Sequence, residues 1–417
     1  MLDTLAAALE PLPPAPRWLI GLSGGLDSHV LLHSLHALSK IRTLPPLAAV
    51  HVHHGLNPQA DHWQAHCISL CHDLDIPLTV QAVDARPATG ESPEAAARSA
   101  RYRAIAHVMQ SGEILLTAHH RRDQAETLLL QLLRGAGPAG LAAMPRLKPF
   151  GPGWQARPVL DLDRDRLVAY AQEAALRWVE DDSNADLRFD RNGLRQVIMP
   201  QLRQRWPSLD ATVSRAALLQ AEAQDLLAER AREDLELVRG SVPGTLSVAG
   251  LTRLRRPRLR NALRGWLQDK GLPMPGRVRL ESVIEQVLKA GPDASPRVAW
   301  AGAEVRRYRD DLYALEPLVP VDRGWVWQWT PTAPLTLPEL GITLDPALLQ
   351  SQWGVNPSTL TTPLRVCLRQ GGEVMRWRGQ TRLLKKLFQE AGIPPWIRDR
   401  LPLVYVDEQL VAVWGIL

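Results

Sequence analysis

The first 135 residues alternate between short apolar runs and segments with helical periodicity. The apolar runs predict buried strands at residues 17–22, 47–52, 78–83 and 113–118. The helical patterns that follow them cover residues 27–39, 61–74, 93–110 and 123–133. Strands that alternate with helices favour an α/β domain with a doubly wound parallel sheet, and ligands of such sheets bind at the carboxyl ends of the strands.

The chain changes character after about residue 205. Helical patterns and then strand-like pieces follow, at residues 211–239, 257–268, 278–289, 297–300 and 304–308. Residues 251–320 contain 14 Lys and Arg against 8 Asp and Glu, an excess larger than the net charge of +5 for all 417 residues. Of the 49 basic residues, 43 are arginine. Arginine binds phosphate bidentately and so favours a polyanionic partner, although codon usage in a GC-rich genome explains this composition equally well.

The first predicted strand ends in Ser23-Gly24-Gly25-Leu26-Asp27-Ser28, directly before a helical pattern. The two glycines allow a tight turn and a close approach of the backbone to a ligand, and the first N–H groups of the helix form an anion site. The loop lacks the Gly-Lys-Ser/Thr ending of a Walker A loop, and it is not the G-x-G-x-x-G dinucleotide fingerprint. We therefore predict a phosphate site of another kind at residues 23–28.

This hexapeptide resembles the PP-loop of the N-type ATP pyrophosphatases, whose members cleave ATP between the α- and β-phosphates to adenylate a substrate oxygen. The resemblance implies that ATP is a co-substrate and that the loop holds its pyrophosphate portion. It also implies Mg²⁺ as a cofactor, with Asp27 at the position that helps to hold the ion. The ATP-binding residues implied in this way are Ser23, Gly24, Gly25, Leu26, Asp27, Ser28 and His53.

Further motifs narrow this resemblance. They are His51-Val52-His53-His54-Gly55-Leu56, Glu94-Ala95-Ala96-Ala97-Arg98, Ala118-His119-His120, Asp123-Gln124-Ala125-Glu126-Thr127, Leu133-Arg134-Gly135, Glu180-Asp181-Asp182-Ser183-Asn184 and Asp190-Arg191-Asn192-Gly193-Leu194-Arg195. In this order, over residues 17–206, the series is similar to the tRNA(Ile)-lysidine synthetase family. Residues 363–417 resemble the C-terminal part of the three-domain form of that family.

This second resemblance implies an activity and its substrates. The family joins lysine to C2 of the wobble cytidine of the CAU-anticodon isoleucine tRNA, through an adenylated cytidine. The products are lysidine, AMP and pyrophosphate, and the modification changes decoding from AUG to AUA and identity from methionine to isoleucine. The chain is therefore expected to be an ATP-dependent ligase that acts on tRNA.

The resemblance also implies roles for individual residues. The implied catalytic residues are Asp27, Arg98, His119 and Asp123. The residues implied to bind lysine or cytidine are Glu126, Asp181, Asp190 and Arg191. The residues expected to bind tRNA are Arg376, Arg378, Lys385 and Lys386. The spacing of Glu94, Arg98 and Arg101 places them on one helix face, which by itself also fits a solvated row of ion pairs.

One position departs from the family pattern. The family usually has two acidic residues after the paired histidines, whereas this chain has His119-His120-Arg121-Arg122-Asp123. Arg122 replaces the first acid, and Asp123 remains. If both carboxylates hold metal or lysine in the family, this chain does so with one fewer. His53 stands where relatives often have Asn or Asp, which is a milder change.

Four segments are expected along the chain. Residues 1–205 form the PP-loop ATP-binding catalytic domain, and residues 206–320 a mainly helical, basic tRNA-binding domain. Residues 321–362 form a linker or β segment rich in Pro and Trp, and residues 363–417 a small α+β tRNA-binding domain. The expected fold class is thus α/β with a doubly wound parallel sheet, followed by a helical domain and a small α+β domain.

The cysteine count indicates the compartment. Only three cysteines occur, which fits a reducing cytoplasm rather than a disulfide framework. No run of about 18 apolar residues and no secretory signal is apparent, so we expect neither a membrane partner nor export. The spacing of His62, His66, Cys67 and Cys71 does not suit zinc, and we expect these side chains to pack a helix face. The expected partners are isoleucine tRNA, L-lysine and ATP, and a homodimer stays open.

Two other classes of function are alternatives to this one. Another PP-loop tRNA-modifying enzyme, such as a thiolase, needs a catalytic cysteine pair, and a synthetase that uses glutamine needs a glutaminase domain. Neither feature is evident in the sequence. A non-catalytic tRNA-binding relative is expected to have lost Asp27 or the loop glycines, and all of these are present. Arg122 is the one feature that favours this last alternative.

Overall fold

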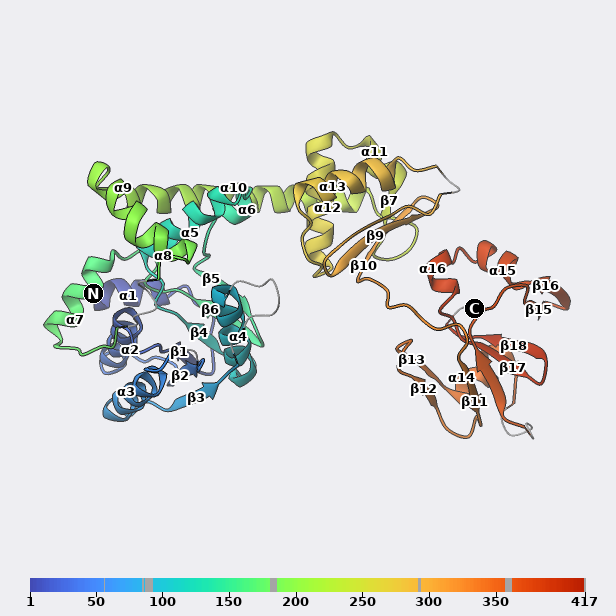
Figure 1. Ribbon diagram of the computed structural model, residues 1–417, viewed down its shortest axis with the longest axis horizontal. Helices are drawn as coiled ribbons and strands as arrows, with labels where there is room; N and C mark the ends of the chain where they lie inside the picture. Colours follow the sequence, from blue (N-terminus) through green and yellow to red (C-terminus); the bar gives the residue numbers. More distant parts are fainter. Residues whose placement is uncertain are drawn as a thin grey trace. The chain divides into compact units, whose positions relative to one another are not determined.

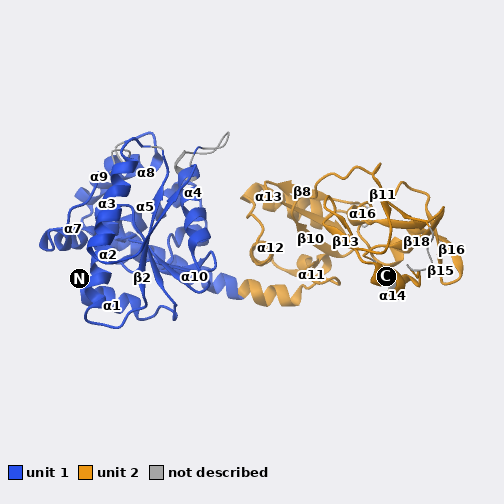
Figure 2. Cartoon of the chain, turned by 90° about the horizontal axis from the view of Figure 1, so that it is seen from below, with its two compact units in different colours: residues 1–229 blue, residues 230–417 orange. Residues whose placement is uncertain are grey.

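The computed structural model describes residues 1–55, 57–84, 86, 93–180, 186–291, 294–356 and 362–415. The chain divides into two compact units, Met1–Glu229 and Arg230–Leu417 (Figure 2). Each unit has its own hydrophobic clusters, so each is described by itself. Among the described residues, no helix combines the length and the apolar character that a membrane span requires.

Unit 1 is built on a six-stranded sheet in the order β3-β2-β1-β4-β6-β5 (Figure 1). The strands are β1 (Trp18–Gly21), β2 (Leu47–His53), β3 (Leu78–Ala82), β4 (Ile114–Leu116), β5 (Leu147–Phe150) and β6 (Gly153–Ala156). All neighbouring pairs are parallel except β5 and β6, which form an antiparallel hairpin at the edge. The parallel sheet predicted from the alternation of strands and helices is confirmed.

The helices of unit 1 cover both faces of this sheet. They are α1 (Leu2–Leu9), α2 (Leu26–Ser39), α3 (Ala60–Asp73), α4 (Pro93–Val108), α5 (Arg121–Leu133), α6 (Pro138–Leu141), α7 (Arg164–Glu173), α8 (Asp190–Gly193) and α9 (Met199–Arg205). A π-helical segment (Leu194–Ile198) joins α8 to α9, and the long helix α10 (Leu209–Leu237) runs across the boundary between the units.

Successive side chains of a strand point to opposite faces of the sheet, and this alternation explains why the central strands need helices on both faces. Ile20 and Leu116 belong to a cluster with α1, α2, α3 and α7, whereas Leu19 and Leu115 belong to a cluster with α4. All four side chains are at most 2% exposed. Because successive residues point to opposite faces, a strand that is apolar throughout must be covered twice.

The β5–β6 hairpin is absent from the sequence-based expectation. Its residues, Leu-Lys-Pro-Phe-Gly-Pro-Gly-Trp-Gln-Ala, contain two prolines and two glycines and so resemble a turn rather than a strand pair. The structure explains Gly153, because a Cβ atom there would lie 2.1 Å from the carbonyl oxygen of Glu113. The backbone of Glu113 approaches so closely that only glycine fits at position 153 in β6.

Unit 2 begins with helices packed on a four-stranded antiparallel sheet in the order β7-β10-β9-β8. The strands are β7 (Leu246–Ser247), β8 (Arg297–Trp300), β9 (Ala303–Tyr308) and β10 (Asp311–Leu315). The helices are α11 (Val248–Arg253), α12 (Arg256–Asp269), α13 (Arg277–Ser282) and a π-helical segment (Val283–Leu288). Trp266, Val283 and Leu312 lie in one cluster of buried side chains that joins the helices to the sheet.

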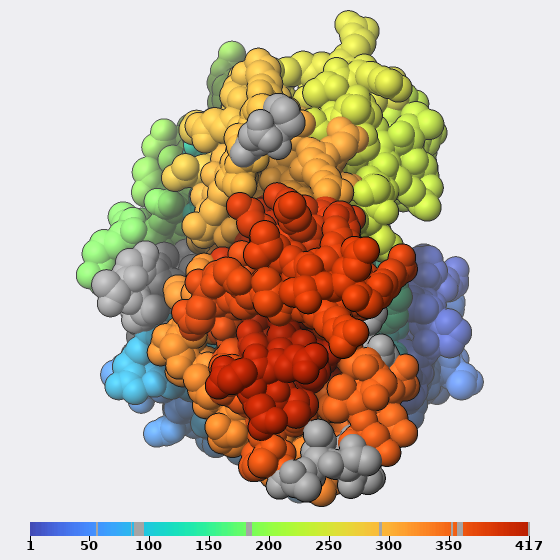
Figure 3. Space-filling model, turned by 90° about the vertical axis from the view of Figure 1, so that its right-hand side faces the viewer, coloured from blue at the N-terminus to red at the C-terminus, as the bar shows by residue number. Residues whose placement is uncertain are grey.

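The rest of unit 2 has a second four-stranded antiparallel sheet, in the order β11-β14-β17-β18. Its elements, with two short hairpins and three helices, are β11 (Val326–Trp329), β12 (Leu335–Leu337), β13 (Ile342–Leu344), α14 (Pro346–Trp353), β14 (Leu364–Cys367), β15 (Val374–Trp377), β16 (Gln380–Leu383), α15 (Leu384–Glu390), α16 (Pro395–Arg398), β17 (Leu403–Val406) and β18 (Gln409–Val413). In Figure 3 the residues near the C-terminus, coloured red, lie next to one another on the surface of unit 2. Since β11 pairs with β14, the segment rich in Pro and Trp contributes a strand to this sheet.

Trp396 joins the two sheets of unit 2. Its ring contacts the rings of Tyr308 and Tyr313 edge to face, with centroids 6.4 and 5.4 Å apart. Arg398, which is 7% exposed, donates to the hydroxyl of Tyr308 at 2.8 Å and to the carbonyl oxygen of Ile393. Aromatic contacts of this kind add about 1 kcal/mol beyond burial, so Trp396 ties α16 to β9 and β10.

The buried His29 makes the stability of the protein depend on pH. Its side chain lies in α2, its residue is 4% exposed, and burial together with the nearby His66 lowers its pKa to about 4. The unfolded chain takes up this proton below about pH 6.5, whereas the folded chain does not until about pH 4. The free energy of unfolding is therefore expected to fall by up to about 3 kcal/mol as the pH decreases through this window.

Urea unfolding at several pH values between 7.5 and 4.5 measures this effect. We expect His29→Gln to flatten the decline relative to the wild type, because glutamine does not titrate. His72→Gln is the control, since His72 is exposed on α3. An unchanged pH dependence in His29→Gln would contradict the assignment.

Candidate active site

The loop Ser23–Ser28 lies at the point where the winding of the sheet reverses. It follows β1, and α2 begins at Leu26. The chain proceeds from β1 toward β2 and β3 on one side and returns through α4 to β4 on the other side of β1. Loops that leave neighbouring strands in opposite directions open a crevice, and this is where open α/β sheets bind ligands.

The conformation of this loop requires its first glycine. Gly24 has φ +85°, and a Cβ atom there would lie 2.9 Å from Cγ2 of Val179. The backbone N–H of Val179 donates to the carbonyl oxygen of Gly24 at 3.1 Å. Any other residue would be strained and would meet the strand-like segment that packs on the loop.

The two serines of the loop hold each other in place. The backbone N–H of Ser23 donates to Oγ of Ser28 at 3.1 Å, and the two hydroxyl oxygens are 3.0 Å apart. The hydroxyl of Ser28 donates to the carbonyl oxygen of Gly25. The N–H groups of the first turn of α2 have no partner within the helix, so the loop presents donors to an anion at this end.

A cleft of about 720 Å³ opens beside this loop. The ends of β1, β2 and β4 and the start of α5 contribute to its wall. Nine of the residues predicted for the site line it: Ser23, Gly25, Leu26, Asp27, Ser28, His53, His119, Asp123 and Glu126. The sequence motifs, which are spread over about a hundred residues, thus meet at one edge of the sheet.

Asp27 faces this cleft with one oxygen free of hydrogen bonds. Its Oδ1 atom is buried without a hydrogen-bond partner, and it lies 3.7 Å from Nε of Arg164. Its Oδ2 atom lies 3.6 Å from Nε2 of His120. His120 also lies 3.4 Å from Asp123, so it connects the two carboxylates.

A second pair of carboxylates, Asp123 and Glu126, lies one helical turn apart on α5. Arg195 donates to both oxygens of Glu126 at 2.8 and 2.7 Å and to Asp123 at 2.7 Å. Arg191 donates to the same two carboxylates at 3.2 and 3.3 Å. Glu126 is 1% exposed, so these charges can be buried only because the two arginines compensate them.

The electrostatic surroundings favour the charged forms of Asp123 and Arg195. Burial alone would raise the pKa of Asp123, but its interactions with His120 and Arg191 outweigh burial and hold the pKa well below its usual range. Burial likewise opposes the charge of Arg195, but the hydrogen bonds to Glu126 raise its pKa above the usual value.

His119 is neutral at physiological pH. Burial lowers its pKa to about 3, and the cations Arg157 and Arg98 contribute to the shift. Its Nδ1 atom lies 3.0 Å from the hydroxyl of Thr117, which fixes the ring. A neutral imidazole at the edge of the cleft can donate or accept a hydrogen bond at a reacting group, while its low pKa makes it a weak base.

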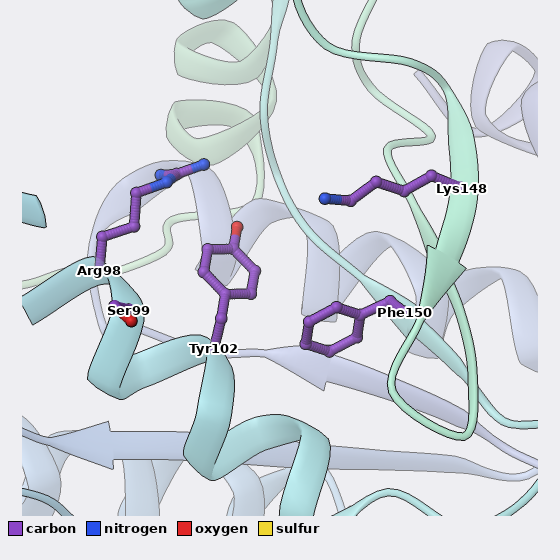
Figure 4. Close-up of a pocket in the computed structure, with 5 residues that line it drawn as sticks. All are labelled: Arg98, Ser99, Tyr102, Lys148 and Phe150. Carbon is purple, nitrogen blue, oxygen red and sulfur yellow. The ribbon is translucent and has the colours of Figure 1, made fainter. Parts of the chain in front are cut away.

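The remaining predicted residues lie elsewhere in the fold. Arg98 lies on α4 over the ring of Tyr102, in a separate cavity (Figure 4). Asp190 is exposed and lies 3.7 Å from Arg134. Asp181 lies outside the described residues. The residues predicted for tRNA are all exposed in unit 2, on β15, the following turn and α15: Arg376, Arg378, Lys385 and Lys386.

Three residues at the cleft were not predicted as functional. Arg195 carries a signal in the sequence, since it lies four residues after Arg191 and so shares a helix face with it. His120 lies within the paired-histidine motif, but nothing in the pattern distinguishes its role from that of His119. Arg164 has no local signal, because its approach to Asp27 depends on the packing of α7 against α2.

Arg122, the position that departs from the family, is part of an ion-pair cluster. Its guanidinium lies 2.7 Å from Asp165 and 3.8 Å from Asp210. Arg203 lies 2.8 Å from the same oxygen of Asp210. Two carboxylates from α7 and α10 therefore face the arginine, which explains how this basic residue is accommodated beside the cleft.

Comparison with known proteins agrees with this geometry. The fold and the loop define a PP-loop enzyme that uses ATP, and the family model described as the PP-loop domain matches residues 2–202. Models described as the TilS substrate binding domain and the TilS substrate C-terminal domain match residues 246–313 and 364–417.

Curated relatives identify the family. The chain is 46% identical to a tRNA(Ile)-lysidine synthase of Alkalilimnicola ehrlichii, over 99% of this chain and 92% of the relative. It is 42% identical to a tRNA(Ile)-lysidine synthase of Methylococcus capsulatus, over 99% of this chain and 94% of the relative. The chain belongs to the tRNA(Ile)-lysidine synthase family.

The cluster around Arg122 predicts that the acidic residue usual in the family is unfavourable here. Arg122→Asp would place a carboxylate beside Asp165 and Asp210, and we expect it to lower the free energy of unfolding by roughly 1 kcal/mol. The double variant Arg122→Asp/Asp165→Arg restores opposite charges and should recover most of the loss. Urea unfolding measures both, and a single variant as stable as the wild type would contradict this account.

Proposed function

We propose that this protein ligates lysine to C2 of the wobble cytidine of the CAU-anticodon isoleucine tRNA, at the expense of ATP. The observation that carries the proposal is the single cleft in which the loop Ser23–Ser28, His119 and the carboxylates of Asp123 and Glu126 meet. Membership of the family over 99% of the chain supports it. The product, lysidine, would change decoding from AUG to AUA and identity from methionine to isoleucine.

The reaction requires two bond exchanges in one place. The C2 oxygen of cytidine attacks the α-phosphorus of ATP, and pyrophosphate leaves. The lysine ε-amine then attacks C2, the C2–O bond breaks, and AMP leaves. Most of the rate enhancement in such a sequence comes from positioning and from stabilising charge, both of which a rigid cleft at strand ends supplies.

The loop and Asp27 fit the phosphates and a magnesium ion. The N–H groups at the start of α2 and the serine hydroxyls bind the pyrophosphate portion of ATP. Asp27 has a buried oxygen without a hydrogen-bond partner, and Mg²⁺ is commonly held by one or two carboxylates together with substrate phosphates. When bound, the ion would neutralise charge on the phosphates. We also assign His53, which lines the cleft, to the ATP site.

The carboxylates on α5 fit the amino-acid substrate. Asp123 and Glu126 line the cleft, and we assign the lysine ammonium to them in exchange for part of their contacts with Arg191 and Arg195, with Arg191 between lysine and cytidine. His119 is neutral and can accept a hydrogen bond from the ammonium, but its lowered pKa makes it a weak base, so we assign it to positioning the lysine rather than to taking its proton. Asp190 stays a predicted contact, as does Asp181 outside the described residues.

The second unit fits the tRNA. We assign tRNA binding to residues 206–320 and 363–417, with the ATP-binding catalytic domain at residues 1–205 and a β segment at residues 321–362. The excess of basic residues over residues 251–320 supports a polyanionic partner. Cytidine must leave the anticodon stack to expose C2, as in other enzymes that modify bases. We place the reaction in the cytoplasm, and sedimentation of the purified chain tests the homodimer.

Incubation of the protein with ATP, Mg²⁺, labelled lysine and the CAU-anticodon isoleucine tRNA tests the proposal. We expect label in the RNA and release of AMP, both lost when the wobble cytidine is replaced by uridine. Asp27→Asn should lower both by about 100-fold or more, because it removes a charge at the phosphates, and should leave tRNA affinity unchanged.

Each outcome of this incubation has a meaning. Release of AMP without incorporation of lysine into the RNA would mean that another compound is the nucleophile, and it would contradict the proposed lysine ligase activity. Near-normal turnover in Asp27→Asn would contradict the assignment of the loop. Neither product, with tRNA still bound, would favour a non-catalytic relative that binds tRNA.

Lys385 and Lys386 on α15 are predicted to contact tRNA phosphates. Each phosphate contact contributes about one unit to the slope of log affinity against log salt concentration. We expect Lys385→Gln/Lys386→Gln to reduce this slope by about two, measured by filter binding at several salt concentrations. Lys40→Gln, an exposed lysine at the end of α2, serves as the control. An unchanged slope in the double variant would remove α15 from the interface.

A further inference from the structure

A second cavity, of about 380 Å³, lies beside the catalytic cleft on the α4 face of the sheet. Helix α4 contributes Arg98, Ser99 and Tyr102, and the edge strand β5 contributes Lys148 and Phe150. Figure 4 shows Arg98 and Lys148 reaching toward the hydroxyl of Tyr102 from opposite sides, with the ring of Phe150 beside that of Tyr102. The proposed reaction assigns no role to this cavity, although the family resemblance implies a catalytic role for its Arg98.

The residues that line this cavity include two cations, Arg98 and Lys148, and no acid. Arg98 lies over the ring of Tyr102, 5.0 Å from its centroid. Nearby lies Arg157, which is 3% exposed and whose Nε atom has no hydrogen-bond partner among the described residues. Burial and the charges of Arg157 and Arg98 lower the pKa of Lys148. Three neighbouring cations raise the local positive potential, which an anionic ligand would relieve.

The cavity also has an aromatic wall. The rings of Tyr102 and Phe150 meet edge to face with centroids 5.6 Å apart. The hydroxyl of Tyr102 accepts a hydrogen bond from Nε2 of Gln155 at 3.2 Å, which holds the ring. Unpaired bases of RNA bind by stacking on aromatic side chains while cations meet the phosphates. The two types of side chain that line this cavity are thus those of a nucleotide site.

The cavity adjoins the site of reaction. Tyr102 lines both the cavity and the catalytic cleft. Arg98 and Arg157 both lower the pKa of His119, so they lie within electrostatic reach of the cleft. An RNA strand that presents one base to the cleft therefore has its neighbouring nucleotide within reach of this cavity.

We propose that this cavity binds the nucleotide next to the reacting cytidine, with its base against Tyr102 and Phe150 and its phosphate between Arg98 and Lys148. The inference rests on the proposed function and extends it to a specific subsite for the RNA. The free amino acid is a poorer occupant, because lysine carries two ammonium groups that the surrounding cations repel. Binding at this subsite would keep the cytidine extruded from the anticodon stack.

Filter binding of the full-length protein to isoleucine tRNA, without ATP and lysine, tests the subsite. We expect Phe150→Leu, which keeps the apolar volume but removes the aromatic face, to weaken binding about 5- to 100-fold. Lys148→Gln should reduce the salt slope by about one, and the control Lys40→Gln should leave it unchanged. Thermal unfolding of each variant confirms that the fold is retained.

A tRNA with one abasic nucleotide beside the wobble cytidine makes the test specific. If the base occupies the cavity, Phe150→Leu has no further effect on this RNA, and an abasic nucleotide elsewhere in the loop leaves the effect intact. Wild-type affinity in both variants would overturn the proposal. So would a rise in the KM for lysine with unchanged RNA affinity, which would assign the cavity to the amino acid.

The experiments distinguish failure of the proposed subsite from failure of the proposed function. RNA affinity is measured without chemistry, so the subsite can fail while lysine is still incorporated. Conversely, absence of lysine incorporation by the wild type overturns the ligase activity whatever the two variants do to binding.

Discussion

The catalytic unit depends on the pairing of charges that the fold buries at the carboxyl edge of its sheet. Glu126 and Asp123 are almost inaccessible, and an unpaired carboxylate in such a place costs several kcal/mol. Arg191 and Arg195 supply the compensation from a segment that lies about 70 residues further along the chain. The same contacts tie α5 to the helical segments that contain Arg191 and Arg195, so the charge network beside the cleft also stabilises this edge of the sheet. Unit 2 uses the same solution at Glu304, which is fully buried between two arginines.

Compensation also explains the residue that most departs from the family pattern. Arg122 stands where an acid is usual, yet Asp165 and Asp210 lie within reach of its guanidinium. Beside the cleft, negative charge is thus present on Asp165 of α7 and Asp210 of α10 rather than at position 122. Asp123 and Asp27 keep their places, so the non-catalytic alternative that Arg122 favoured has no support from the geometry of the cleft itself.

Two cavities of unit 1 differ in the chemistry of the side chains that line them. The cleft combines an anion-binding loop with paired carboxylates, which suits phosphates and an ammonium group. The cavity on the α4 face combines cations without acids and two aromatic rings, which suits a nucleotide. Tyr102 lines both the cleft and this cavity. Arg98 and Arg157 also lower the pKa of His119, which lines the cleft.

The sequence by itself determined what depends on neighbours along the chain. The alternation of strands and helices, the loop Ser23–Ser28 and the grouping of the motifs at strand ends follow from periodicity, glycine conformation and N–H groups at a helix start, which are all local. Tertiary packing decided the β5–β6 hairpin, whose sequence resembles a turn because of its prolines and glycines. It also decided the contacts of Arg195 with Asp123 and of Arg164 with Asp27. Those contacts join residues tens of positions apart, and only the packing of helices on the sheet brings their charges within a few ångströms.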